Sequence, residues 1–144
     1  MLDGKADLHT HTHHSDGALS PLELIIKAQS VGLGAISITD HDTVHAVGEA
    51  TSLGKQHDVE VVPGIELSAT YNDSEIHLLG YFVDVTNEPL LESLAIFREE
   101  RLKRVERIVN KLNRMNIPLT VESVLANAGQ GTVGKLLSDD ALYR

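Results

Sequence analysis

Three side chains of the kinds that bind metal ions lie within eight residues near the start of the chain: His9, His11 and Asp16. On a β-strand, successive side chains alternate between two faces, so His9 and His11 would point the same way, about 6–7 Å apart. That spacing lets two imidazoles bind one metal ion. Asp16 follows at a turn that Gly17 allows. The stretch therefore predicts a metal site, against the alternative of a polar loop with surface histidines.

Three more groups of the same chemistry follow downstream: His41, Glu66 and His77. Imidazoles and carboxylates suit Zn, Mn or Fe(II). Six such groups exceed the four ligands of a closed structural zinc site, so we expect two or more ions, with Glu66 as a bridge. Clustered ions polarise a phosphoryl oxygen, lower the pKa of bound water and stabilise the negative charge on the leaving oxygen. No side-chain nucleophile is then required.

The remaining acidic and histidine side chains near these groups have secondary roles in this interpretation. We expect Asp7 and Asp42 to orient the ligand imidazoles. We expect the other histidines to be exposed, namely His13, His14, His45 and His57.

The elements that must position the donors alternate between strands and helices. Strands are expected over 5–12, 35–39, 59–62 and 76–83, and helices from 21 to about 32 and over 43–56. Ser20-Pro-Leu-Glu23 is a capping box with Pro at the first helical position. Pro63-Gly64 is expected to end the third strand, just before Glu66. This rhythm predicts an α/β fold with a parallel sheet, whose strand ends bind ligands.

The pattern changes after Asp84. Apolar residues at helical spacing predict one long helix over 89–115, and seven of the twelve Lys and Arg residues of the chain lie in it. These residues form either a solvated face, balanced by nearby Glu residues, or an edge that contacts phosphate. A short helix is expected over 121–128.

Composition narrows the classes of protein. The 144 residues match one ordinary domain, and the absence of cysteine excludes disulfides, thiolate nucleophiles and Cys-based zinc sites. A formal charge of −9 disfavours broad nucleic-acid binding but allows a small phosphorylated substrate. No apolar signal core or membrane span is present, so we expect a cytoplasmic protein with no membrane partner. Residues 129–135 match most of a phosphate-binding P-loop, but Leu136 stands where the motif has the Ser or Thr that binds magnesium. We therefore do not expect a nucleotide P-loop here.

Four ordered motifs resemble the polymerase-and-histidinol-phosphatase (PHP) family of metal-dependent phosphoesterases. They are Asp7-Leu-His-Thr-His-Thr12 with Ser15-Asp16-Gly17, Thr39-Asp-His-Asp-Thr43, Pro63-Gly-Ile-Glu66 and Ile76-His-Leu-Leu-Gly80. Gly17-Ala-Leu-Ser-Pro21 and the Arg-rich helix look most like the stand-alone branch that acts on nucleotides. That branch includes nucleoside 3′,5′-bisphosphate phosphatases and enzymes that trim RNA 5′ ends. The resemblance covers residues 5 to 115.

The resemblance implies a distorted (β/α)₇ barrel that holds up to three divalent ions of Mn, Fe or Zn. Residues 1–86 would form the N-terminal part of this catalytic barrel and 87–144 a helical insertion, with the remainder of the barrel absent. The implied metal ligands are His9, His11, Asp16, His41, Glu66 and His77. Within this set we expect Asp16, His41 and Glu66 to be catalytic. Arg101 and Arg104 match positions that contact substrate phosphate.

The chain also departs from the family pattern. It has no histidine after His77, and Lys135-Leu136-Leu137 stands where an Arg/Lys-Xaa-His element is usual. The metal sites thus lack their later ligands. We therefore expect a C-terminally incomplete fragment that binds fewer ions than a full-length relative and self-associates through its unfinished barrel.

The leading functional hypothesis is a hydrolase: a metal-dependent phosphoesterase that hydrolyses a phosphomonoester of a nucleotide or a short RNA end by metal-activated water. One rival is a metal-binding but catalytically inactive module or truncated fragment. The other is an amidohydrolase, which also uses His-Xaa-His on its first strand. The Glu66 position and the Asp16 motif argue against the amidohydrolase.

Overall fold

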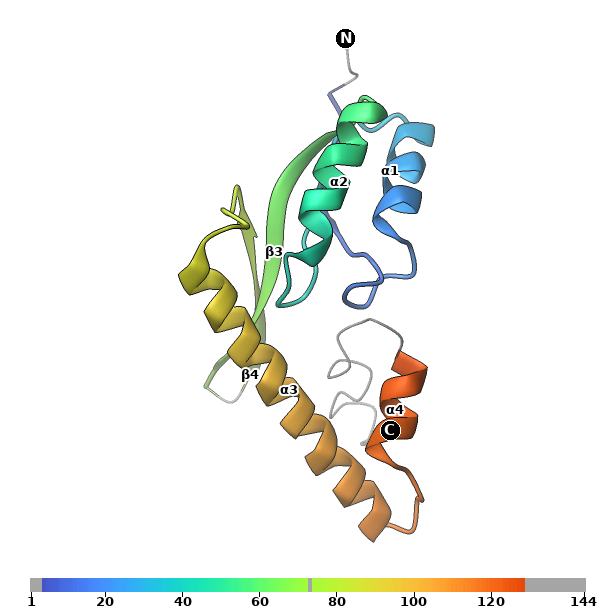
Figure 1. Cartoon of the computed structure of the whole chain (residues 1–144), viewed down its shortest axis with the longest axis vertical. Helices are drawn as coiled ribbons and strands as arrows, with labels where there is room; N and C mark the ends of the chain where they lie inside the picture. The colour runs from blue at the N-terminus through green and yellow to red at the C-terminus, as the bar shows by residue number, and fades with distance from the viewer. Residues whose placement is uncertain (1–3, 73, 129–144) are drawn as a thin grey trace.

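The computed structural model describes residues 4–72 and 74–128, and within them each expected strand and helix is present (Figure 1). In chain order the elements are β1 (Ala6–Thr10), α1 (Pro21–Ser30), β2 (Ala35–Ile38), α2 (His45–Gln56), β3 (Glu60–Tyr71), β4 (Ser74–Tyr81), α3 (Glu88–Arg114) and α4 (Val121–Ala128). The P-loop-like segment, residues 129–135, and Lys135-Leu136-Leu137 lie outside the described residues.

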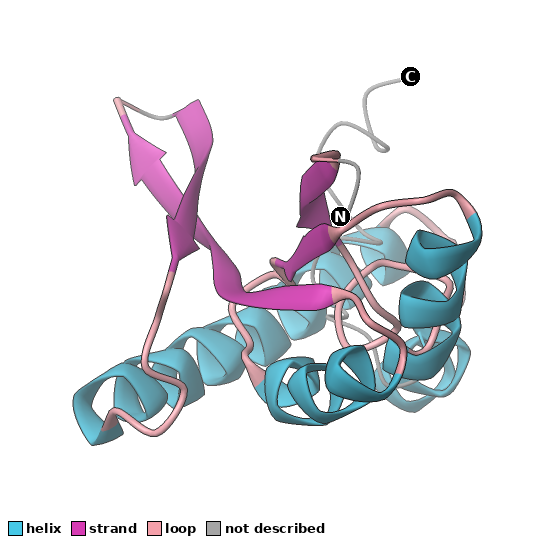
Figure 2. Ribbon diagram, turned by 90° about the horizontal axis from the view of Figure 1, so that it is seen from above, coloured by secondary structure: helices cyan, strands magenta, loops and turns pink. Residues whose placement is uncertain are grey.

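The strands form one curled sheet in the order β1-β2-β3-β4, with the helices gathered on one side (Figure 2). The pairs β1–β2 and β2–β3 are parallel, as expected, but β4 pairs antiparallel with β3. A short turn at Asn72 joins β3 to β4, and a connection that short allows only antiparallel pairing. The predicted parallel sheet is confirmed for β1, β2 and β3 but does not extend to β4, and the α/β partial barrel is confirmed.

Strand β3 is longer than predicted, because Pro63-Gly64 does not end it. The strand pairs with β2 as far as Pro63 and with β4 from Gly64 onward. A Cβ atom on Gly64 would lie 2.3 Å from Ser37 Oγ, so glycine permits the close approach of β3 to β2. Glu66 consequently lies inside β3 rather than just past its end.

Two apolar clusters hold the helices on the sheet. Ile25 of α1, Ile36 and Ile38 of β2 and Ala46 of α2 form part of the first cluster. The second joins α2, β3 and the start of α3 through Val44, Val47, Ile65 and Leu94. The first turns of α3 therefore pack directly beside the strand that carries Glu66.

The helix starts follow the local sequence signals. Ser20 N donates to Glu23 Oε2 at 2.8 Å, and Ser20 Oγ accepts from Glu23 N at 3.3 Å, which confirms the capping box. The hydrogen bond from the Ser20 backbone lowers the pKa of Glu23. Asn87 Oδ1 caps α3 by accepting from Leu90 N. None of the described helices combines the length and apolar composition needed to cross a membrane.

Candidate metal centre

Glu66 lies at the centre of the candidate site, and only 4% of the residue is exposed. Its Oε2 is 3.0 Å from His9 Nε2, 3.1 Å from His11 Nε2 and 3.5 Å from His41 Nε2. Its Oε1 is 2.6 Å from His77 Nδ1. One buried carboxylate thus contacts four of the imidazoles singled out from the sequence.

Backbone pairing places His41 and His77 beside Glu66. Beyond the end of β2, Asp42 N donates to Glu66 O at 2.9 Å, and His41 and Glu66 form a parallel bridge. On the other side of β3, His77 lies opposite Ser68 in the antiparallel register. Ser68 is two residues from Glu66 on the same strand. The side chains of Glu66, Ser68 and His77 therefore share one face of the sheet.

Asp16 approaches the same centre from the loop that follows β1. Its Oδ1 is 3.2 Å from His11 Nδ1, and its Oδ2 is 3.7 Å from His41 Nε2. A Cβ on Gly17 would lie 2.2 Å from His11 O, so this loop is tightly folded against its own start. The structure therefore brings together all six predicted donors.

Asp40 holds this loop in place, a role that the sequence analysis missed. The residue is 1% exposed, and its carboxylate accepts hydrogen bonds from Thr12 N at 2.7 Å, Thr12 Oγ1 at 2.6 Å and Ser15 Oγ at 2.7 Å. An Asp directly after a buried apolar strand was the available signal, because a buried carboxylate needs hydrogen-bond donors.

The donors fall into three overlapping groups whose ligand atoms all lie within 4.8 Å of one another: His9–His11–Glu66, His11–Asp16–His41 and His41–Glu66–His77. His11 belongs to the first and second groups, and His41 to the second and third, so each group has three donors. Imidazole nitrogens and carboxylate oxygens in sets of three fit divalent transition-metal ions.

The electrostatics of Glu66 favour its charged form. Burial raises the pKa of Glu66, but the hydrogen bonds with His9 and His77 and the charges of His41 and His11 outweigh that effect and hold the pKa below its ordinary value. An ionised carboxylate among imidazoles is the protonation state that a cation requires.

The two residues expected to orient imidazoles make other contacts. Asp7 Oδ1 accepts a hydrogen bond from His9 N at 3.2 Å, which is a backbone contact. The Asp42 carboxylate accepts from Ser68 N at 2.9 Å and from Arg101 Nε at 2.9 Å, and it also pairs with Arg101 Nη2. Asp42 therefore ties α3 to β3.

The other histidines lie apart from the three groups. His45 is exposed, as expected, whereas His13, His14 and His57 are partly buried. Burial and the neighbouring His13 lower the pKa of His14.

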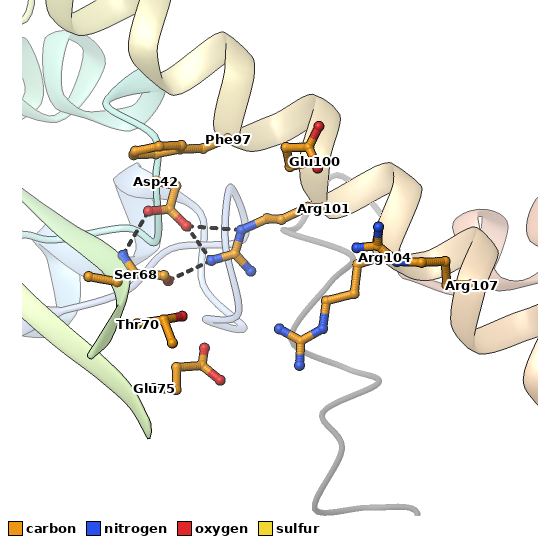
Figure 3. Close-up of a pocket in the computed structure, with 10 residues that line it drawn as sticks. Asp42, Ser68, Thr70, Glu75, Phe97, Glu100, Arg101, Arg104 and Arg107 are labelled. Atoms are coloured by element: carbon orange, nitrogen blue, oxygen red, sulfur yellow. Dashed lines mark hydrogen bonds and ion pairs between the residues drawn. The ribbon is translucent and has the colours of Figure 1, made fainter. Parts of the chain in front are cut away.

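A pocket of about 280 Å³ lies between α3 and the β3–β4 pair (Figure 3). Arg101, Arg104 and Arg107 line it from the helix, and Ser68, Thr70 and Glu75 line it from the strands. Arg101 Nη2 donates to Ser68 Oγ at 2.6 Å. Within residues 4–72 and 74–128, the hydrogen bonds of Arg101 are made by its Nε and Nη2 atoms.

Comparison with known proteins identifies a family and several relatives. A family model described as "PHP domain" matches residues 7–121. The chain is 36% identical over 132 residues to the 5′-3′ exoribonuclease Rnm of Escherichia coli, covering 89% of this chain and 45% of the relative. It is 31% identical over 111 residues to the 3′,5′-nucleoside bisphosphate phosphatase of Chromobacterium violaceum, covering 77% of this chain and 39% of the relative.

Two solved structures resemble this one. A Bifidobacterium adolescentis protein assigned as a metal-dependent phosphoesterase matches with a TM-score of 0.81 and 32% identity, covering 94% of this chain and 48% of that one. A Chromobacterium violaceum protein described as an amidohydrolase, with bound sulfate and no metal, matches with a TM-score of 0.80 and 26% identity, covering 90% and 45%. The chain thus spans less than half the length of each of these four proteins.

Proposed function

The chain belongs to the PHP-domain family, and we propose that it supplies the core of a metal-dependent phosphoesterase that hydrolyses a phosphomonoester of a nucleotide or of a short RNA end. The observation that carries this proposal is the convergence of His9, His11, His41 and His77 on the buried Glu66, beside a pocket with three arginines.

The proposal assigns the residues as follows. The three donor groups would hold up to three divalent ions, of Mn, Fe or Zn, and Glu66 would belong to two of the groups. Such ions, when bound, would polarise the phosphoryl group and lower the pKa of water. Asp16, His41 and Glu66 would be the catalytic set. Residues 1–86 would be the barrel part and 87–144 the helical insertion.

The arginines of α3 would bind and orient the substrate. Asp42 and Ser68 Oγ fix the guanidinium of Arg101 at the pocket wall, so little side-chain freedom is left to lose when phosphate binds. Arg104 lines the same pocket one helical turn further on. Asp42 balances the charge of Arg101, so Arg101 would contribute hydrogen-bond donors to a phosphate, and Arg104 would contribute a further guanidinium.

The test is phosphate release from AMP by the Mn²⁺-loaded chain. Glu66→Gln should abolish metal-dependent release, while Glu60→Gln, which changes an exposed carboxylate on the same strand, should leave it intact. Bound metal without hydrolysis of any phosphoester would instead favour the inactive module.

Amide hydrolysis is the second candidate, because the C. violaceum structure at 26% identity is described as an amidohydrolase. Parallel assays with a phosphomonoester and an N-acyl amino acid separate the two. Phosphate release without amide cleavage supports the phosphoesterase, and the reverse result removes it.

A further inference from the structure

Phe97 is the one apolar residue of α3 that lines the pocket. It lies four residues before Arg101 and seven before Arg104, so the three side chains share one face of the helix. Leu94 and Val105 of this helix are 6% and 0% exposed, but Phe97 is 40% exposed and lines the pocket. Figure 3 shows its ring beside Asp42 at the wall of the pocket. The ring thus lies beside a polar space that three arginines and three acidic side chains line.

The pocket adjoins the metal centre through three direct neighbours. Asp42, on its wall, follows the donor His41 in sequence. Ser68 lies opposite the donor His77 across β3 and β4. Glu75 Oε1 lies 3.3 Å from His77 Nε2. A phosphomonoester whose phosphoryl group reached the donors would therefore extend its leaving group into this pocket.

We propose that Phe97 is a stacking platform for the nucleobase of the substrate and makes the site select nucleotides over sugar phosphates that lack a base. This inference rests on the proposed function. A volume of about 280 Å³ lies just below the roughly 300–1,000 Å³ of drug-sized sites, which suits a single nucleotide unit. A flat, partly exposed ring offers a base a dispersion contact, and the guanidinium groups in the same pocket offer hydrogen bonds to its phosphates.

The chemistry of the pocket disfavours an aliphatic leaving group. Apart from Phe97 and Ala69, its lining side chains are polar or charged. An alkyl chain would desolvate these groups without pairing them, which costs free energy. A base presents both an apolar face to the ring and polar edges to Ser68, Thr70 and Glu75.

The first experiment measures binding without turnover. The Mn²⁺-loaded chain is titrated by calorimetry with the 5′-phosphonate analogues of adenosine and of ribose, which lack the scissile bond. We expect the adenosine analogue to bind roughly 5- to 100-fold more tightly, the range that stacking of one base provides. Phe97→Leu should remove this preference without weakening the ribose analogue, and Phe97→Tyr should keep it. Equal affinities in the unmodified chain would overturn the proposal.

The second experiment uses the absence of tryptophan from the chain. Phe97→Trp introduces a single fluorophore whose emission the adenosine analogue should quench in a saturable way, while the ribose analogue should not. Phe82→Trp is the matched control, because Phe82 is the other phenylalanine, is 80% exposed and does not line the pocket. Quenching that is equal in both variants, or absent from both, would contradict stacking at Phe97.

Phosphate release and base binding can be tested separately. Metal-dependent phosphate release from AMP and ribose 5-phosphate at equal efficiency would preserve the phosphoesterase and refute the role of Phe97. Saturable quenching of Phe97→Trp without any phosphate release would preserve base binding and refute the phosphoesterase.

Discussion

Glu66 connects the donor groups because its two carboxylate oxygens face different imidazoles. Oε2 faces His9, His11 and His41, whereas Oε1 faces His77. The residue types and the His-Xaa-His spacing predicted these donors from the sequence. The sharing of His11 and His41 between groups could not be predicted, because it depends on how the loop after β1 folds onto the end of β2.

At this scale we predict that Glu66→Ala loses more metal than His77→Ala. Glu66 belongs to two of the three donor groups and His77 to one, so the first change should affect two ions. Metal analysis after gel filtration of the reconstituted chain measures the difference. His57→Ala, outside all three groups, is the control. Equal metal content in the Glu66 and His77 variants would remove the bridging role.

Asp40→Ala should destabilise the chain and also weaken metal binding. The change removes three hydrogen bonds to a buried carboxylate and leaves their donors near Thr12 unpaired, which should cost about 2–5 kcal/mol of unfolding free energy. Urea unfolding measures the cost, and Glu49→Ala, an exposed acidic position on α2, is the comparison. If both variants unfold at the same urea concentration, Asp40 does not hold the loop.

At the scale of elements, local signals predicted the helices well and β3 poorly. The capping box at Ser20 and the apolar spacing of α3 are local features, so the sequence alone contains them. Pro63-Gly64 resembles a strand end in the sequence. In the structure, β3 pairs with β2 up to Pro63 and with β4 from Gly64 onward. A change of partner depends on residues far along the chain, which a local pattern cannot register.

The close contact at Gly64 gives a prediction for β3. Gly64→Ala should cost about 1–3 kcal/mol of unfolding free energy, because the new Cβ would lie 2.3 Å from Ser37 Oγ and 3.0 Å from Ile38 O. Gly48→Ala in α2 should instead stabilise the chain by about 0.5–1 kcal/mol, since a Cβ there meets nothing within 4 Å and alanine favours helix. Thermal or urea unfolding compares the two, and opposite signs are expected. A neutral Gly64→Ala would refute the packing constraint.

At the scale of the molecule, the described sheet is open at both edges. β1 and β4 each have one strand partner among the described residues, and Leu8, Ile76 and Leu78 are exposed on them. Unpaired strand edges with apolar side chains favour association. The partial barrel was predicted from family motifs that the sequence lacks after His77, whereas the packing of α3 against β3 required the structure.

We predict that the chain self-associates through a strand edge. Sedimentation velocity should show a concentration-dependent shift toward dimers or larger species. Leu78→Lys on β4 should reduce the shift, because a charge on an edge strand opposes pairing. Ile96→Lys, at an exposed apolar position on α3, should not reduce it. A monomer at all concentrations would show that these edges do not drive association.

We infer that six side chains form one divalent-metal centre, and anomalous diffraction from a crystal grown with Mn²⁺ would locate the ions. We expect Mn²⁺ peaks within the donor groups of His9–His11–Glu66, His11–Asp16–His41 and His41–Glu66–His77, with Glu66 contacting two ions. Mn²⁺ bound elsewhere on the chain, with these imidazoles and carboxylates still paired only to one another, would contradict it.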